Sequence, residues 1–143
     1  MIKKLQLKLT PLCLMRIALG IVYLWFGSLK LFPNYSPAEQ LAIDTINKLT
    51  FGILGDQFAI LLLASMELAI GLFLVFNLFK KQVVLVALCH IACTFTPLFL
   101  FYDQSFNDSP MVLTLLGQYI VKNLVLASAL FVILKEPDLI KEQ

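Results

Sequence analysis

The sequence has few of the residues on which the chemistry of most soluble enzymes depends. It holds a single histidine and three cysteines among 143 residues, and the cysteines form no C-x-x-C pair. Without a second histidine or a carboxylate at ligand spacing, we expect no metal site. The chain also has no phosphate-binding loop, no hydrolytic triad and no motif for a flavin, a haem or an iron–sulfur cluster. Its basic residues are spread along the chain, so we expect no binding to nucleic acid.

What the sequence has instead is long apolar runs. Hydrophobic residues make up 60% of the chain and the mean hydropathy is +0.90, whereas soluble domains are roughly 45 to 50% apolar. A helix needs about 20 mainly apolar residues to cross a bilayer, and four stretches qualify: residues 12–32, 58–79, 83–102 and 111–134. Strands of a membrane barrel would show shorter segments of alternating polarity. The sequence therefore predicts an all-α, integral membrane four-helix bundle that forms one domain over residues 1–143.

The distribution of charge predicts an orientation for this bundle. Basic residues precede the first run, fill the linker between the second and third runs, and follow the last run, whereas most acidic residues fall in the other two linkers. The positive-inside rule then places both termini in the cytoplasm and the protein in the plasma (inner) membrane as a multi-pass protein.

The linker after the first run predicts a further, shorter helix. Ser36 and Glu39 have the spacing of a capping box, and Pro37 suits the first helical position. Apolar residues then recur at helical spacing to about residue 50. This segment is too short and too polar to span a membrane, so the sequence predicts an interfacial helix over residues 37–50 that lies on the outer surface or caps the bundle.

The first apolar run carries a stripe of polar and small residues. Arg16, Gly20, Tyr23, Gly27 and Lys30 are spaced 4, 3, 4 and 3 residues apart, which places them on one helical face. Glycines allow another backbone to approach closely, so this face should contact protein. The two cations can either reach the membrane interfaces or act inside the bundle, and the sequence leaves both alternatives open.

Three ionisable residues fall in the middle of the other three runs. Counted at 1.5 Å per residue, Glu67, His90 and Lys122 lie about 14, 18 and 16 Å below the outer boundary. An isolated charge at that depth costs at least about 2.5 kcal/mol. We therefore predict that Glu67 pairs with Lys122, with His90 or Tyr119 as further partners.

Polar and small residues near this cluster are expected to support it. Gln118 and Asn123 flank Lys122, and Gly71, one turn after Glu67, should leave room beside the carboxylate. Tyr23 on the first run would face the same region.

A proline in the third run predicts a kink. Pro97 cannot donate a backbone hydrogen bond, so a carbonyl one turn earlier loses its partner. Thr94 and Thr96 directly precede it. Their hydroxyls are expected to satisfy the carbonyls that the kink frees.

Three segments of the chain resemble DoxX-like membrane proteins, a family of small four-helix proteins common in bacteria. They read RIALGIVYLWFGSLKLFP from Arg16, ELAIGL from Glu67 and GQYIVKNLVLASAL from Gly117. The matching positions include Arg16, Lys30, Glu67, Lys122 and Asn123. The resemblance implies a membrane protein that is in some members a subunit of a thiosulfate:quinone oxidoreductase and in a related branch is associated with oxidant stress. Many members have no known activity.

Two main functions remain open on the sequence, beside a third possibility that the chain only anchors another protein. In the first, the chain is the membrane subunit of a quinone-linked oxidoreductase, and its ligand or proton-relay candidates are Glu67, His90, Lys122, Tyr119 and Arg16. Its electrons would come from a redox partner. In the second, the chain is a non-enzymatic membrane factor that binds a partner or passes a small solute or a proton, and the cluster is a gate or a packing lock. Besides membrane lipids and such a partner, a second copy of the chain could bind it.

Overall fold

The computed structural model describes residues 10–36, 38–107, 109 and 111–135. Four segments are long and apolar enough to cross a membrane: Pro11–Leu29, Asp56–Phe76, Lys80–Leu100 and Leu115–Lys135. Apart from one isolated bridge between Phe106 and Leu113, regular structure in these residues is helical. The predicted all-α bundle of four membrane helices is confirmed.

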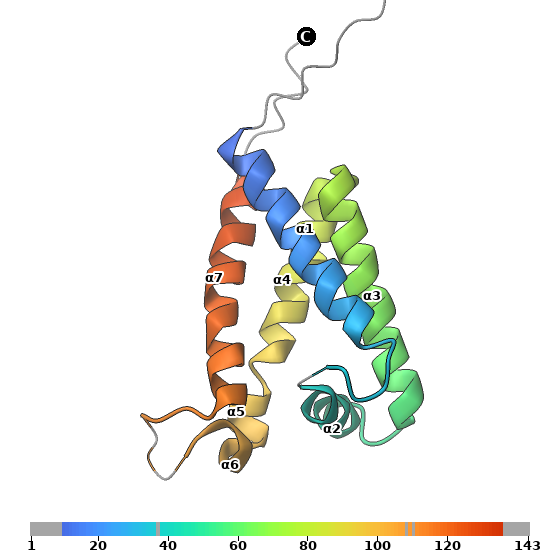
Figure 1. The fold of residues 1–143 in the computed structure, drawn as a ribbon, viewed down its shortest axis with the longest axis vertical. Coiled ribbons are helices and arrows are strands. Elements are labelled where there is room, and N and C mark those ends of the chain that lie inside the picture. The colour runs from blue at the N-terminus through green and yellow to red at the C-terminus, as the bar shows by residue number, and fades with distance from the viewer. Residues whose placement is uncertain (1–9, 37, 108, 110, 136–143) are drawn as a thin grey trace, which may run out of the picture.

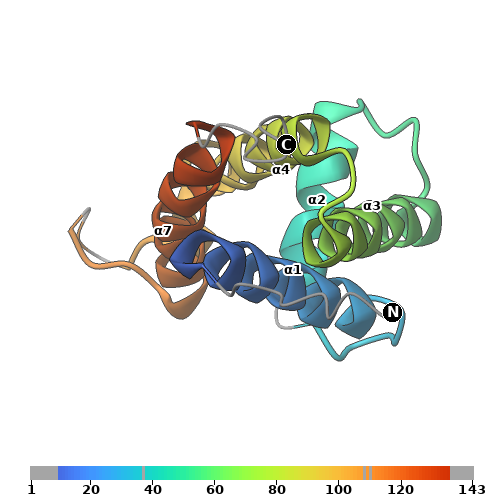
Figure 2. The same cartoon turned by 90° about the horizontal axis from the view of Figure 1, so that it is seen from above.

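The four long helices form two packed pairs. Helix α1 (Pro11–Leu29) packs along α3 (Asp56–Phe76), and α7 (Leu115–Lys135) packs along α4 (Lys80–Thr94). Seen along the bundle, α1, α3, α4 and α7 follow one another around a common centre (Figure 2). The start of α1 and the end of α7 lie at the same end of the molecule (Figure 1). An even number of spans requires this, while the cytoplasmic location of that end stays a prediction.

Helix α1 is shorter at its C-terminal end than the sequence indicates. It begins with Pro11 at its first position, where the Thr10 hydroxyl accepts a hydrogen bond from the Cys13 amide at 3.2 Å. It ends at Leu29, three residues before the predicted end at residue 32. Figure 1 shows its C-terminal end part-way along α3 rather than level with the end of α3. Lys30 is therefore carried into the interior of the bundle.

A tight turn joins α3 to α4. Asn77 and Phe79 both adopt positive φ, 56° and 48°, and the Leu78 amide bonds to the Phe73 carbonyl at 2.9 Å, as at many helix ends. The turn contains two apolar residues, which is why the apolar run extends to residue 79 although α3 ends at Phe76. The result is an antiparallel hairpin of two membrane helices.

Helix α4 is interrupted where the sequence predicts a kink. It ends at Thr94, and α5 (Pro97–Leu100) continues in the same span. The Thr96 hydroxyl donates to the Cys93 carbonyl and the Thr94 hydroxyl to the Ile91 carbonyl, both at 2.7 Å. The predicted role of these threonines beside Pro97 is confirmed.

Short elements cover the end of the bundle opposite to the start of α1 and the end of α7. Helix α2 (Glu39–Leu49) lies across this end with Leu41, Ile43 and Thr45 buried, and α6 (Tyr102–Ser105) follows α5 (Figure 1). Residue 37, the predicted start, lies outside the described residues. The predicted capping box is wrong, because Ala38 caps α2 without a side-chain bond and the Glu39 carboxylate accepts from the Asn34 amide at 2.9 Å.

The first residues of the fourth apolar run belong to a loop. The Asn107 amide bonds to the Val112 carbonyl at 2.8 Å, and the Thr114 amide bonds to the Ser105 carbonyl at 3.0 Å. The Thr114 hydroxyl then accepts from the Gly117 amide at 3.1 Å. These bonds explain why α7 begins at Leu115 and not at residue 111.

Glycines let α1 and α3 approach to backbone contact. A Cβ atom on Gly71 would lie 2.8 Å from both the Gly20 carbonyl oxygen and the Leu24 amide nitrogen, and one on Gly27 would lie 3.1 Å from the Glu67 Cβ. Gly71 thus makes room for the backbone of α1. Our prediction that Gly71 leaves space beside the Glu67 carboxylate is wrong, since the atoms nearest to a Cβ on Gly71 belong to Gly20 and Leu24 of α1.

Candidate functional site

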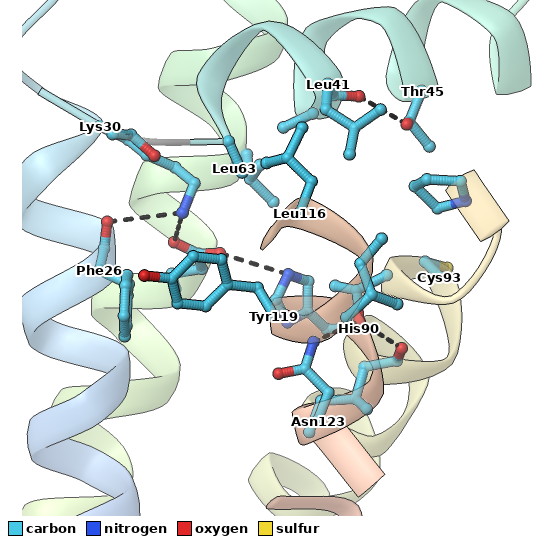
Figure 3. Close-up of a pocket in the computed structure, with 18 of the residues that line it drawn as sticks. Phe26, Lys30, Leu41, Thr45, Leu63, His90, Cys93, Leu116, Tyr119 and Asn123 are labelled. Atoms are coloured by element: carbon cyan, nitrogen blue, oxygen red, sulfur yellow. Dashed lines mark hydrogen bonds and ion pairs between the residues drawn. The ribbon is translucent and has the colours of Figure 1, made fainter. Parts of the chain in front are cut away.

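Four side chains from three helices form a continuous line of polar contacts inside the bundle. Lys30 Nζ lies 2.7 Å from Glu67 Oε2, and His90 Nε2 lies 3.4 Å from Glu67 Oε1 (Figure 3). The Tyr23 hydroxyl lies 3.2 Å from His90 Nδ1. The side chains of Lys30, Glu67 and His90 are only 9%, 8% and 10% exposed. We call these four residues the polar line.

The polar line can carry its hydrogens in two arrangements. A carboxylate only accepts, so His90 Nε2 donates to Glu67, and in a neutral ring Nδ1 then accepts from the Tyr23 hydroxyl. If both ring nitrogens carry protons, Nδ1 donates to the Tyr23 oxygen. The hydroxyl is then free to donate to the Ala87 carbonyl, 3.3 Å away. Both arrangements use the same heavy-atom contacts.

The partner of Glu67 differs from the one predicted. Glu67 pairs with Lys30, the residue that follows α1, so the predicted pair with Lys122 is wrong, while His90 is confirmed as a further partner. The physical reason is the early end of α1, which brings Lys30 to the depth of the carboxylate. The Lys122 ammonium instead lies 5.5 Å from the centre of the Tyr119 ring, within the range of a cation–π contact.

Arg16 lies far from the polar line, near the other end of α3. Its guanidinium donates to the carbonyls of Leu74 and Val75, the latter at 3.0 Å. These carbonyls belong to the last turn of α3, where the regular helical hydrogen bonds end, and the Leu74 carbonyl also accepts from the Asn77 amide at 3.3 Å. Arg16 therefore caps α3, and the structure does not bring it together with Glu67, His90 or Tyr23.

The two predicted supporting residues on α7 take separate roles. Asn123 Nδ2 donates to the Thr94 hydroxyl at 2.9 Å and so links α7 to α4. Gln118 reaches back to the Leu113 carbonyl at 3.5 Å in the outer loop. Neither contacts the Glu67 carboxylate among the interactions that the described residues form.

The polar line borders a cavity of about 410 Å³ between the two helix pairs. This volume lies within the range of small-molecule sites, roughly 300 to 1,000 Å³. In Figure 3, Phe26 and Lys30 enter from α1 on one side, and Tyr119 and Asn123 enter from α7 on the other. Most of the surface that lines the cavity is apolar.

Helix α2 supplies the outer wall of this cavity, a role that the sequence interpretation did not assign to it. The α2 residues that line the cavity share one helical face: Leu41, Ala42, Thr45, Ile46 and Leu49. The apolar periodicity of residues 38–49 is the signal that predicts a buried face. It cannot tell whether that face meets lipid, protein or a cavity.

The described residues offer no set of three or more histidine, cysteine or acidic side chains that could hold a metal ion. The groups available to a ligand are hydrogen-bond donors and acceptors, and they include the Lys30 and Lys122 ammonium groups, the Glu67 carboxylate, the His90 ring and the Tyr23 and Tyr119 hydroxyls. They are the types that bind carbonyl or hydroxyl oxygens.

Part of this chain matches a known protein family. The DoxX family model matches residues 12–103, about two thirds of the chain. The chain belongs to the DoxX family. The match includes all four residues of the polar line, while α7 of this DoxX protein, with Tyr119 and Lys122, lies beyond the matched residues. Searches among curated proteins and among solved structures gave no match.

Proposed function

We propose that this DoxX protein is the membrane subunit of a quinone-linked oxidoreductase, and that the cavity between the helix pairs holds the quinone headgroup. The observation that carries the proposal is the polar line on the cavity wall. Its groups are linked over consecutive distances of 2.7, 3.4 and 3.2 Å from Lys30 to Tyr23.

The chemistry of quinone reduction suits such a wall. Conversion of a quinone to a quinol takes up two electrons and two protons, one proton at each carbonyl oxygen. The Tyr23 or Tyr119 hydroxyl and the Lys30 ammonium can donate hydrogen bonds to those oxygens. Glu67 and His90 can pass protons along the polar line, and an oriented acid–base group speeds such transfers by about 10²- to 10⁴-fold.

The electrons must come from a second protein. The sequence has no motif for a flavin, a haem or an iron–sulfur cluster, so a partner with its own redox group would supply both electrons. In this proposal the chain contributes the binding site and the proton path, and it is one component of the complete enzyme.

The proposal includes an orientation. With both termini in the cytoplasm, α2 and the cavity behind it lie toward the outer side, and the turn at Lys80 and Lys81 faces the cytoplasm. The support is the distribution of charge over the linkers. A reporter that is active only in the cytoplasm, fused after the last residue, tests this orientation. Activity is expected, and its absence together with activity of an externally active reporter would reverse the assignment.

The proposed function is tested with Glu67→Gln, which keeps the shape of the side chain but removes its charge. Purified wild-type protein is expected to retain quinone that solvent extraction recovers, and the variant is expected to lose it together with quinone reduction in membranes. Ser65→Ala is a matched control. Ser65 is an exposed residue of the same helix, and its hydroxyl donates to the Leu61 carbonyl one turn earlier. If wild-type protein holds no quinone and Glu67→Gln reduces quinone at the normal rate, the proposal fails.

One observation supports a second candidate, a packing lock without redox function. Lys30 and Glu67 join the same two helices that already meet through Gly20 and Gly71. A buried charge pair at such a place can fix how two membrane helices dock. The lock predicts that replacing both residues by neutral ones restores a stable protein with unchanged function, whereas the redox proposal predicts a stable protein without quinone binding.

A further inference from the structure

The charges that line the cavity do not cancel. Its titratable lining residues are Lys30, Glu67, His90, Lys122 and Cys93, with the hydroxyls of Tyr23 and Tyr119. Lys30 and Glu67 neutralise each other at 2.7 Å. No carboxylate in the part of the chain that the structure describes pairs with Lys122. With a neutral His90, the lining thus carries one net positive charge.

Lys122 lies where a ligand could reach it. It follows Leu115 by seven residues, which places it about 11 Å into the span from the start of α7. It lines the cavity and is also exposed, so it stands at an opening of the cavity. The Tyr119 ring lies 5.5 Å from its ammonium, and a ring face offers no lone pair to its three hydrogen-bond donors. An unpaired cation inside a membrane span is unfavourable, so an anionic partner would be stabilising.

We propose that Lys122 binds the acidic group of an amphiphilic monoanion whose apolar body fills the cavity. The apolar part of the lining comes from several helices and includes Leu41, Ile46, Leu63, Ile91 and Leu126. One acidic group balances the one excess cation, and the remaining surface favours hydrocarbon or an aromatic ring. The ligand is thus a long-chain carboxylate or an alkylated quinone with an acidic hydroxyl, which share this chemistry.

This inference rests on the cavity being a ligand site, as in the proposed function, and not on electron transfer. An acidic quinone would satisfy both proposals. A carboxylate that binds without any quinone chemistry would support the anion site alone, so the two proposals can fail independently.

The experiment compares matched acidic and neutral ligands. The full chain is reconstituted in nanodiscs of neutral phosphatidylcholine, with empty nanodiscs to correct for partitioning into lipid. One pair of probes is dodecanoate and methyl dodecanoate, and the other is a 2-hydroxy-3-alkyl-1,4-naphthoquinone and its 2-methoxy counterpart. The acidic member of at least one pair is expected to bind about tenfold more tightly, as for one hydrogen bond to a charged group.

Variants of two lysines on α7 test whether Lys122 causes the preference for the acidic ligand. Lys122→Met is expected to abolish it and Lys122→Arg to retain it, because Arg keeps the charge and the donors. Lys135→Met, at the end of the same helix and outside the cavity lining, is expected to leave it unchanged. Glu67→Gln removes the one carboxylate of the lining, so it should strengthen binding of dodecanoate relative to methyl dodecanoate.

Three outcomes would overturn the inference. Equal affinity of acidic and neutral ligands in both pairs would show that the excess charge selects nothing. An acid preference that survives in Lys122→Met would place the anion elsewhere. An equal loss in Lys135→Met would indicate a general effect of charge at the membrane. In each case Lys122 would be an anchor that reaches toward the outer interface. Preference in one pair alone supports the inference and identifies which acidic chemistry binds.

Discussion

The α1–α3 pair and the α4–α7 pair of the bundle are held together by different means. Between α1 and α3, glycines bring backbones into contact and the charges are paired, with Lys30 on Glu67 and Arg16 on the last carbonyls of α3. Between α4 and α7, the described side-chain hydrogen bond runs from Asn123 to Thr94. The comparison suggests a rigid pair that positions the polar line and a second pair that forms the adaptable side of the cavity.

The largest effect is expected where α1 and α3 touch. Gly71→Leu places a side chain against the Gly20 carbonyl and the Leu24 amide, and neither backbone group can move aside. We expect a loss of about 3 kcal/mol or more in the free energy of unfolding, at the upper end for overpacked sites. Chemical unfolding in mixed micelles measures this loss.

Gly55→Ala is the matched control for this substitution. A Cβ atom on Gly55 would meet no heavy atom beyond its chain neighbours within 4 Å. Because Gly55 is the N-cap of α3, where alanine is less favourable than glycine, we expect a loss of at most about 1 kcal/mol. If Gly71→Leu were as well tolerated as Gly55→Ala, the backbone contact would not hold α1 against α3, and the contrast between the two pairs would disappear.

The next effect concerns the partner of Glu67. Lys30→Met or Glu67→Gln alone leaves one buried partner without its counterpart, so each is expected to cost about 3 kcal/mol. The double variant should cost less than either single one, because no unpaired charge remains. Unfolding of the four proteins gives the coupling energy.

Lys122→Met tests whether Lys122 is also a partner of Glu67. Its ammonium contacts only the Tyr119 ring among the interactions of the described residues, so its removal should not lower stability and should show no coupling to Glu67→Gln. A strong coupling of Lys122 with Glu67, and none of Lys30, would return the pairing to the one that the sequence favours.

The wrong prediction of a pair between Glu67 and Lys122 shows how much of the structure can be predicted from the sequence. Four apolar runs were enough to predict the spans, and counting residues along them placed Glu67 and His90 at one level, where they do meet. Counting assumes that every span starts and ends at the membrane boundary. Helix α1 ends early, at Leu29, and this places Lys30 beside the carboxylate.

Other features could not be predicted because they depend on which helices become neighbours. Periodicity assigned Gly20, Tyr23 and Gly27 to one face of α1, but it did not say that α3 packs there. The same limit applies to Gly71, whose role beside the α1 backbone follows only from the helix pairing. Apolar turn residues such as Leu78 and Phe79 hide the ends of helices from any measure of hydropathy.

A smaller effect is expected for Arg16, which tests how α1 is held against α3 at the end of this pair that lies away from the cavity. Arg16→Met removes the donors to the carbonyls of Leu74 and Val75, at a cost of about 1 to 2 kcal/mol. Both bonds come from the same guanidinium nitrogen, Nη1, so the single ammonium of Arg16→Lys should recover part of this loss. Hydrogen exchange should accelerate in the last turn of α3 while ligand binding stays normal. Loss of ligand binding at normal stability would instead place Arg16 in the site.

The smallest effect is expected in the α4–α7 pair, where Asn123 donates to the Thr94 hydroxyl at 2.9 Å. Hydrogen bonds between membrane helices contribute about 0.6 kcal/mol on average, because the separated helices find other partners for the same groups. A double-mutant cycle of Asn123→Ala and Thr94→Val should therefore give a coupling near that value. A coupling as large as that of Lys30 and Glu67 would mean that α7 is fixed as firmly as α1, and the cavity would then have two rigid sides. A small coupling leaves α7 free to shift when a ligand enters, which is what a site that admits molecules from the bilayer requires.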